Sequence, residues 1–396
     1  MSRVFITGMG AISAIGNTVA ENRLALAAGQ CGIRILDRLP SKYSGVLPFG
    51  EVAAGTPALK EKLQVADPGI TRTTLLALHA FEEALSDARL TSSQLMAADT
   101  ALVGASTVGG ICLTDELYRD MNSESGGSEF LSSYDCASVN LYLQARYKMS
   151  GLVTTINTAC SSAANAILYG ARLIKNGLAQ RAIVGGAESL AKFTINGFNA
   201  LQILSPGICM PFDKDRAGLN LGEGAAFLVL EKEEDVTGKK RYAGLSGYCN
   251  ANDAFHPSSL SSEGEGPYRA MKGALQSADL DKEHIGFINA HGTGTENNDE
   301  AESRAMIRLF GDPPAFASTK ANIGHTLGAS GAIEAVYSAL NLFHQEIYAG
   351  LRFKKPIPGT GLRPTGAYKK IPLEHVMSNS FGFGGNCTSL IFSKAN

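Results

Sequence analysis

Residues 151–175, GLVTTINTACSSAANAILYGARLIK, contain the features from which the fold can be predicted. The stretch begins with an apolar strand at 151–156, where β-branched residues favour an extended backbone. A helix of small and apolar residues follows at 161–175. A helix with almost no polar face is buried in the interior of a large protein. We therefore expect this helix to lie between two sheets.

A second helix of the same kind is predicted at 327–342, and it belongs to a weak internal repeat of half the chain. Each half has a short strand, a strand that runs into a Gly/Thr loop, a small-residue helix and a closing apolar strand. In the first half these are 4–7, 101–104, 161–175 and 226–230, and in the second half 242–246, 285–289, 327–342 and 389–393. Strands that alternate with helices favour parallel sheets covered by helices on both faces.

The charged run EKEEDVTGKKR at 231–241 is the clearest linker between the two repeats. We place the boundary there, which predicts an N-terminal half at 1–240 and a C-terminal half at 241–396. The stretch at about 60–134 has no clear counterpart in the second half. We expect it to be an insertion over the top of the fold.

The composition excludes several classes of protein. Among 396 residues the formal net charge is −2, which gives no overall attraction to nucleic acid or anionic lipid. The uncharged stretch at 149–171 is as long as a membrane helix, but polar residues such as Asn157 and Asn165 interrupt it. The N-terminus does not resemble a signal peptide. We expect no membrane span, no nucleic-acid partner and a cytosolic protein.

Cys160 lies at the turn between the strand at 151–156 and the buried helix. A thiol at a helix N-terminus meets a partial positive charge, which favours the thiolate and is predicted to lower the pKa. Such a thiol can act as a nucleophile. A buried cysteine that acts only as a small apolar residue is the alternative. None of the seven cysteines is spaced for a disulfide framework or a Cys-x-x-Cys zinc site.

Three further segments could carry chemistry, although each alone also fits a structural role. His291 in NAHGTGT follows a predicted strand, and Lys320 and His325 in TKANIGH lead into the second buried helix. Lys320 and Glu334 in so small-sided a region are expected to be paired if they are buried. The loop SNSFGFGGN at 378–386 could present backbone N–H groups to an oxyanion, or be a plain tight turn.

Together these segments resemble the β-ketoacyl-acyl-carrier-protein synthase family of the elongating type, within the thiolase superfamily. The matching motifs are VFITGMG at 4–10, TACS around Cys160, PFD at 211–213, GEG at 222–224, HGTGT at 291–295, Lys320 with GH at 324–325, and FGFGG at 381–385. The resemblance implies an α/β thiolase fold, with two similar βαβαβαββ halves in a five-layered α-β-α-β-α sandwich.

The resemblance also implies a decarboxylative Claisen condensation that gives 3-ketoacyl-acyl carrier protein. Cys160 would carry the acyl chain, and His291 and His325 would stabilise the enolate formed from malonyl-acyl carrier protein. Lys320 would organise the histidines and pair with Glu334.

The substrate contacts follow from the same resemblance. Thr293 and Thr295 would bind the pantetheine arm, Val108 would limit the acyl pocket, and Phe383 would gate it. The backbone N–H groups of Phe383 and Cys160 would form the oxyanion hole. No metal or other cofactor is implied, because phosphopantetheine arrives on the acyl carrier protein. The expected partners are that carrier and a second subunit, either an identical chain or a synthase-like chain-length factor.

The sequence departs from the family pattern at 386–388, which reads NCT, in the short stretch 204–211, and in a thin basic cluster at the expected mouth. These departures favour a specialised type II pathway, such as that of aryl polyenes or related polyketides. Two alternatives stay open. One is a thiolase that uses coenzyme A thioesters, with Cys387 as a second cysteine. The other is a non-catalytic chain-length factor, which the intact Cys160, His291 and His325 disfavour.

Overall fold

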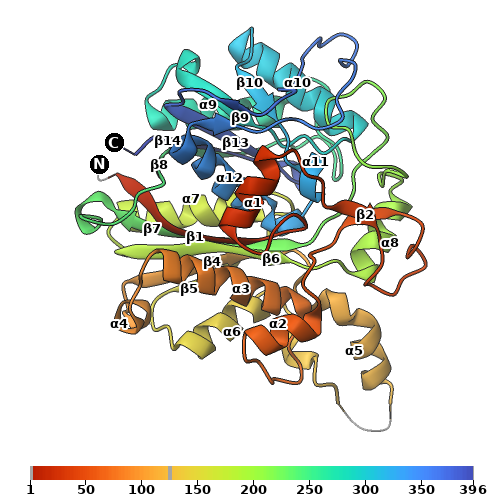
Figure 1. Cartoon of the computed structure of the whole chain (residues 1–396), viewed down its shortest axis with the longest axis vertical. Coiled ribbons are helices and arrows are strands. Elements are labelled where there is room, and N and C mark those ends of the chain that lie inside the picture. Colours follow the sequence, from red (N-terminus) through yellow and green to blue (C-terminus); the bar gives the residue numbers. More distant parts are fainter. Residues whose placement is uncertain (1–2, 124–126, 396) are drawn as a thin grey trace.

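The computed structural model describes residues 3–123 and 127–395 (Figure 1). The main sheet consists of β1 (Val4–Ile12), β4 (Thr100–Ala105), β5 (Val153–Ile156), β6 (Arg181–Glu188), β7 (Gly224–Lys232), β8 (Ala243–Asn252), β9 (Ile285–Asn289), β10 (Ala315–Ala317), β13 (His375–Phe381) and β14 (Asn386–Ser393). Two small sheets pair β2 (Ile33–Ile35) with β3 (Pro48–Gly50) and β11 (Glu346–Ile347) with β12 (Lys369–Lys370).

The α-helices are α1 (Val19–Ala27), α2 (Thr56–Lys62), α3 (Arg72–Asp87), α4 (Ser92–Met96), α5 (Thr114–Met121), α6 (Ser138–Tyr147), α7 (Ser162–Lys175), α8 (Lys192–Ala200), α9 (Glu265–Ala278), α10 (Glu296–Phe310), α11 (Lys320–Ile323) and α12 (Ser330–His344). Short 3-10 helices are η1 (Gly109–Leu113), η2 (Leu131–Ser133), η3 (Glu233–Asp235), η4 (Lys282–His284), η5 (Leu327–Ala329) and η6 (Phe383–Gly385). None of the helices in the described ranges is long and apolar enough to cross a bilayer.

The main sheet uses one five-stranded arrangement twice. Its order is β10-β9-β13-β14-β8-β1-β7-β6-β4-β5. β9 pairs in parallel with β10 and β13, just as β4 pairs in parallel with β5 and β6. The other neighbours are antiparallel, and the halves meet where β1 pairs with β8 through two residue pairs. The expectation of parallel sheets is therefore confirmed for these three-strand groups and wrong for the rest, because the last strand of each half turns back beside the strand before it.

Five layers are visible in Figure 1, and they confirm the expected sandwich. α7 and α12 lie between the two halves of the sheet, α9 covers β8 and β14, and α3 covers β1 and β7 on the opposite outer face. Every residue of α12 from Ser330 to Leu342 is buried, as predicted. α7 is less enclosed than expected, because Tyr169 and Arg172 are exposed.

The predicted insertion at about 60–134 includes elements that belong to the repeat. α3 packs on β1 and β7 as α9 packs on β8 and β14, and β4 occupies the position that β9 has in the second half. Both elements therefore belong to the repeat. The segment without a counterpart runs from the end of β4 to α6 and contains η1, α5 and η2. Residues 124–126 of the expected insertion lie outside the described residues.

We expect Gly331→Ala to destabilise the protein, because the two central helices touch at this glycine. A Cβ atom on Gly331 of α12 would lie 2.5 Å from the backbone nitrogen of Ala164 in α7 and 2.8 Å from its Cβ atom. Overpacking of this kind costs about 1–3 kcal/mol. Denaturant unfolding measures that loss as a lower free energy of unfolding.

Gly197→Ala in α8 is the matched control, because nothing lies within 4 Å of a Cβ atom there. In a helix, alanine in place of glycine stabilises by about 0.5–1 kcal/mol. Equal effects of the two substitutions would contradict close packing of α7 on α12.

Candidate active site

Cys160 lies in a strained turn between β5 and the N-terminus of α7. The preceding residue, Ala159, has a φ of 52°, in the left-handed region that side chains with a Cβ atom rarely adopt. The hydroxyl of Ser162 braces the turn, since it accepts from the Thr158 backbone N–H at 2.8 Å and donates to the Ala159 carbonyl at 2.6 Å. The turn holds the thiol at one fixed position.

The pKa of the Cys160 thiol differs from the predicted direction. Burial raises it to about 11, although the Lys320 ammonium and the backbone N–H groups of Phe383 and Cys160 oppose the rise. Only 6% of the residue is exposed, so loss of hydration outweighs these favourable contacts. The predicted low pKa is therefore wrong, and the thiol has to give up its proton as it reacts.

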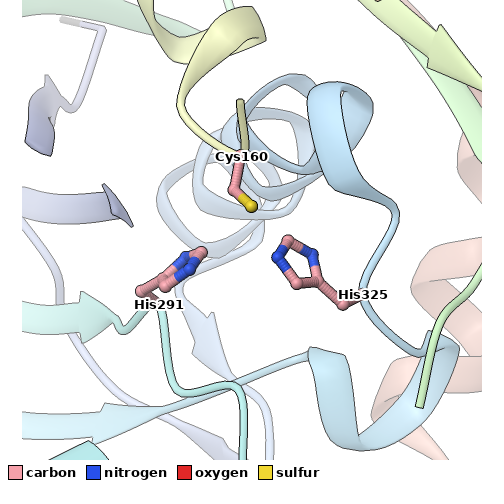
Figure 2. A group of neighbouring side chains, drawn as sticks. All are labelled: Cys160, His291 and His325. Carbon is pink, nitrogen blue, oxygen red and sulfur yellow. The ribbon is translucent and has the colours of Figure 1, made fainter. Parts of the chain in front are cut away.

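His291 and His325 both face this thiol (Figure 2). His291 follows β9, and His325 lies between α11 and η5. One ligand atom from each of the three side chains lies within 4.8 Å of the other two, and the histidine ring centroids are 5.3 Å apart. The structure thus brings together the three residues that the sequence predicted.

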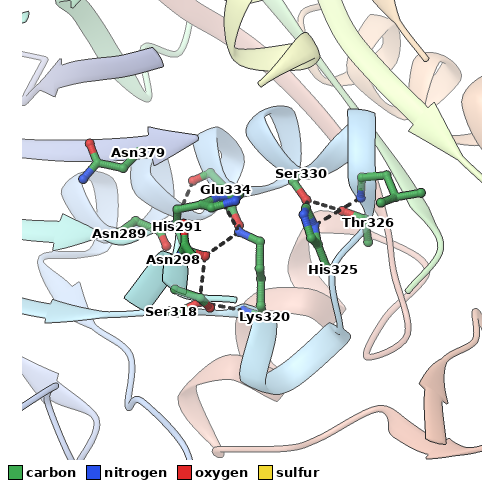
Figure 3. Close-up of polar contacts among 12 residues, drawn as sticks. Asn289, His291, Asn298, Ser318, Lys320, His325, Thr326, Ser330, Glu334 and Asn379 are labelled. Atoms are coloured by element: carbon green, nitrogen blue, oxygen red, sulfur yellow. Dashed lines mark hydrogen bonds and ion pairs between the residues drawn. The ribbon is translucent and has the colours of Figure 1, made fainter. Parts of the chain in front are cut away.

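Lys320 is buried beside His291 and fixes its protonation (Figure 3). The ammonium forms an ion pair with Glu334, donates to the His291 carbonyl at 2.7 Å and lies 3.2 Å from His291 Nδ1. Because an ammonium can only donate, Nδ1 accepts and the ring proton lies on Nε2. The expected pair of Lys320 and Glu334 is present.

His325 has the same tautomer for a similar reason. Its Nδ1 accepts from the backbone N–H of Leu327 at 3.3 Å and lies 3.0 Å from the Ser330 hydroxyl. Burial, with the Lys320 charge as the second cause, places the pKa of both histidines well below the ordinary value. Both rings are therefore neutral near pH 7, and each presents an Nε2–H donor.

Two cavities meet at Cys160. The larger has a volume of about 460 Å³ and is lined by His291, His325, Thr293 and Thr295 among others. The smaller, of about 180 Å³, is mainly apolar, and its lining includes Val108. Cys160 and Phe383 line both cavities.

Phe383 stacks on Phe198, which also lines both cavities, with ring centroids 5.7 Å apart and planes at 16°. Its place at the junction fits the predicted gate. The backbone around Phe383 is tied to the nucleophile helix, because Asn386 Oδ1 accepts from Ser161 Oγ at 2.7 Å and from Asn165 Nδ2 at 2.9 Å. The departure from the family pattern at 386 thus provides bonds that brace the loop that contains Phe383.

Sequence reasoning missed the buried carboxylates that hold the loop around His291. Glu302 accepts from the backbone N–H groups of His291 at 2.9 Å and Gly292 at 2.8 Å. Asp299 accepts from the backbone N–H of Gly294 and, at 2.7 Å, from that of Phe212. Both acids lie on the buried face of α10, directly after the Gly/Thr loop. Their separation of three residues, which places both on one face of a helix, is the signal that could have revealed them.

Two other readings of the site can be tested against the geometry. Cys387 is buried in an apolar cluster with Leu260 and Phe381 and does not line either cavity described, which disfavours a second catalytic cysteine. The sulfur of Cys160 and the two ring nitrogens could hold a soft cation. The Lys320 ammonium next to His291 opposes the binding of a second positive charge.

Two matching halves, with a buried cysteine from one facing two histidines from the other, define a ketosynthase of the thiolase fold. The family model described as "Beta-ketoacyl synthase, N-terminal domain" matches residues 1–236, and that described as "Beta-ketoacyl synthase, C-terminal domain" matches residues 242–354. The chain belongs to the β-ketoacyl synthase family.

Relatives and solved structures agree with this assignment. The 3-oxoacyl-[acyl-carrier-protein] synthase 2 of Rhizobium meliloti is 35% identical, over 100% of this chain and 99% of that protein. The ketosynthase ApeO, solved in complex with its chain length factor ApeC from Xenorhabdus doucetiae, has a TM-score of 0.89 and 32% identity, over 100% of this chain and 98% of that one. A chain of the structure described as a type II PKS acyl-carrier protein in complex with its ketosynthase matches with a TM-score of 0.91 and 25% identity, over 100% of this chain and 100% of that one.

We expect Lys320→Met to destabilise the protein by about 3–5 kcal/mol, because it leaves the Glu334 carboxylate buried without its partner. Both side chains are only 2% exposed. Lys320→Met combined with Glu334→Leu should recover most of the free energy of unfolding, since paired removal leaves no isolated charge.

The exposed pair of Arg269 and Glu265 provides the control. Arg269→Met should change the free energy of unfolding little, because water screens that pair. If the double variant at 320 and 334 were as unstable as the single one, the buried pair would not be the cause.

Proposed function

We propose that this chain catalyses the decarboxylative Claisen condensation of malonyl-acyl carrier protein with an acyl chain held on Cys160. The product is a 3-ketoacyl-acyl carrier protein. One observation carries the proposal: a buried thiol lies at the junction of two cavities and faces two neutral histidines with Nε2–H donors.

In the first half-reaction, Cys160 takes the acyl group from the pantetheine thioester. The Cys160 sulfur attacks the carbonyl carbon, the bond to the pantetheine sulfur breaks, and the proton of the Cys160 thiol passes to that leaving sulfur. The developing oxyanion accepts hydrogen bonds from the backbone N–H groups of Cys160 and Phe383, which already act on the sulfur. The acyl chain then occupies the apolar cavity beside Val108.

In the second half-reaction, the malonyl thioester carbonyl accepts from the Nε2–H groups of His291 and His325. The bond between the carboxylate and the neighbouring carbon breaks, carbon dioxide leaves, and the electron pair of that bond forms the enolate. The enolate carbon attacks the acyl carbonyl, and the bond between that carbonyl and the Cys160 sulfur breaks. The Cys160 thiolate that leaves takes up a proton from water. The neutral rings stabilise the enolate oxygen through hydrogen bonds from Nε2–H, without transferring the ring proton.

The pantetheine arm is proposed to lie along Thr293 and Thr295, whose hydroxyls are 2.8 Å apart in the larger cavity. This arm arrives on the carrier protein, and no further cofactor is proposed. The similarity to the ketosynthase ApeO and the departures at 386–388 and 204–211 support a specialised type II pathway, such as that of aryl polyenes. We propose that the reaction takes place in the cytosol.

The half-reactions can be separated by two variants. Cys160→Ala should take up no acyl group, because the nucleophile is gone. His325→Ala should still be acylated at Cys160 but should lose most of its decarboxylation of malonyl-acyl carrier protein, by about 10²–10³-fold for one lost oxyanion donor. Intact mass measures acylation, and release of carbon dioxide measures decarboxylation. Undiminished decarboxylation by His325→Ala would place the enolate donors elsewhere.

We also propose a dimer, either of two identical chains or of this chain with a synthase-like chain-length factor. β5 is the last strand of the sheet, and its residues are partly exposed. Apolar side chains next to it are exposed, among them Leu152 at 45% and Leu141 at 55%. An unprotected apolar edge strand favours pairing with another chain.

In the dimer, β5 is expected to pair with its counterpart over an interface larger than ~2,000 Å², as in obligate complexes. Thr154→Pro removes a backbone donor from β5 and should give aggregated or poorly folded protein. Light scattering tests the dimer directly. An active monomer of 41.6 kDa at micromolar concentration would contradict it.

A further inference from the structure

Glu188, the last residue of β6, is a fully buried carboxylate without a basic partner. It has no exposed surface, and no Lys, Arg or His within residues 3–123 and 127–395 lies within salt-bridge distance. Burial raises its pKa to about 7, although its hydrogen bonds oppose the rise. A group that is so costly to bury needs a specific task.

Within the described part of the chain, the hydrogen bonds to the Glu188 carboxylate come from one turn, residues 106–108, directly after β4. Its Oε1 accepts from the backbone N–H and, at 2.8 Å, the hydroxyl of Thr107, and from Ser106 Oγ at 3.3 Å. The backbone N–H of Val108 lies 3.3 Å from both carboxylate oxygens. The carboxylate therefore fixes the position of this turn.

The same turn forms one wall of the apolar cavity that begins at Cys160. Thr107 and Val108 line this cavity, and Leu327 lines it too. Gly328, next to Leu327, packs closely against the Glu188 carboxylate, because a Cβ atom at Gly328 would lie 2.7 Å from Glu188 Oε1. Glu188 thus lies behind the cavity wall and touches the turn that carries Val108, but does not line the cavity itself.

We propose that Glu188 is a positioning residue that sets the length of the acyl chain by holding Val108 against the end of the apolar cavity. This inference rests on the proposed function, since it assigns that cavity to the acyl chain. Aspartate would be too short to reach the turn in full. Glutamine has the right size and can keep its carbonyl oxygen at the Oε1 position, but its amide N–H group would then face the backbone N–H of Val108, which donates to Oε2.

Glu188→Gln should therefore loosen the turn at 106–108, so that Val108 can move aside when a longer acyl chain binds. The experiment measures the rate of Cys160 acylation by intact mass, with acyl carrier proteins that carry saturated chains from butanoyl to dodecanoyl. We expect the rate for the longest chains, relative to butanoyl, to rise by about tenfold, as for one methylene of extra room. A merely structural defect would lower all rates together and leave this ratio unchanged.

Two further variants test whether Glu188 acts through Val108. Val108→Ala enlarges the cavity directly and should raise the same ratio. In the double variant, Glu188→Gln should add little, because the side chain that it holds is already shortened. Additive effects would show that Glu188 acts by another route and would overturn the proposal.

The control for a lost buried carboxylate is Glu231→Gln, on β7. The strand register pairs Glu231 with Arg181 at one end of β6, whereas Glu188 lies at the other end opposite Gly224. Glu231→Gln should lower stability and leave the chain-length ratio unchanged. If Glu188→Gln does not fold, Ser106→Ala replaces it. This variant removes one bond to Glu188 and one to the Gly109 backbone without altering the cavity lining.

Ser106→Ala should shift the ratio in the same direction by a smaller factor. Wild-type protein that takes up no acyl chain on Cys160 would overturn the proposed function. If the wild-type protein is acylated but a folded Glu188→Gln or Ser106→Ala variant has the same chain-length ratio as the wild type, only the role of Glu188 is overturned.

Discussion

The protonation state of the whole site depends on one buried ion pair, between Lys320 and Glu334. The ammonium could not be buried alone, and Glu334 compensates its charge. Once it is in place, it occupies Nδ1 of His291 and adds to burial, which is the main cause of the lowered pKa of both histidines. A charge that takes no part in bond formation thereby helps burial to keep two rings neutral and directs one ring N–H into the cavity.

The site exists only because the two halves of the chain pack closely. The first half supplies Cys160 at the N-terminus of α7, and the second supplies both histidines, Lys320 and Glu334. α7 and α12 approach each other through Ala164 and Gly331, so small residues at this contact set the distance between nucleophile and histidines. The composition of the two central helices is thus a condition of catalysis as well as of folding.

Much of this arrangement could be predicted from local sequence, and the failures have physical causes. The strand at 285–289 and the helix at 161–175 were found because their apolar patterns are local. Strand direction was mispredicted because it depends on which strands become neighbours, which no local pattern encodes. α3 was assigned to an insertion because a long segment separates it from β1, the strand that it covers. The direction of the Cys160 pKa shift was wrong because burial, a property of the folded chain, raises the pKa more than the Lys320 charge and the nearby backbone N–H groups lower it.

Glu188, Glu302 and Glu334 share one design, which the sequence revealed only for Glu334. Each is buried, each has a pKa raised to about 7 by burial, and each holds a segment that carries a site residue, namely Val108, His291 and Lys320. Since their pKa in the folded state exceeds the ordinary value of 4.5, their contribution to stability falls as the pH rises from about 4.5 through 7. The histidines act in the opposite sense, because their lowered pKa makes stability fall as the pH drops below 6.5. Between about pH 4.5 and 6.5 the two effects therefore oppose each other, which agrees with buried charge that is retained for position and not for stability.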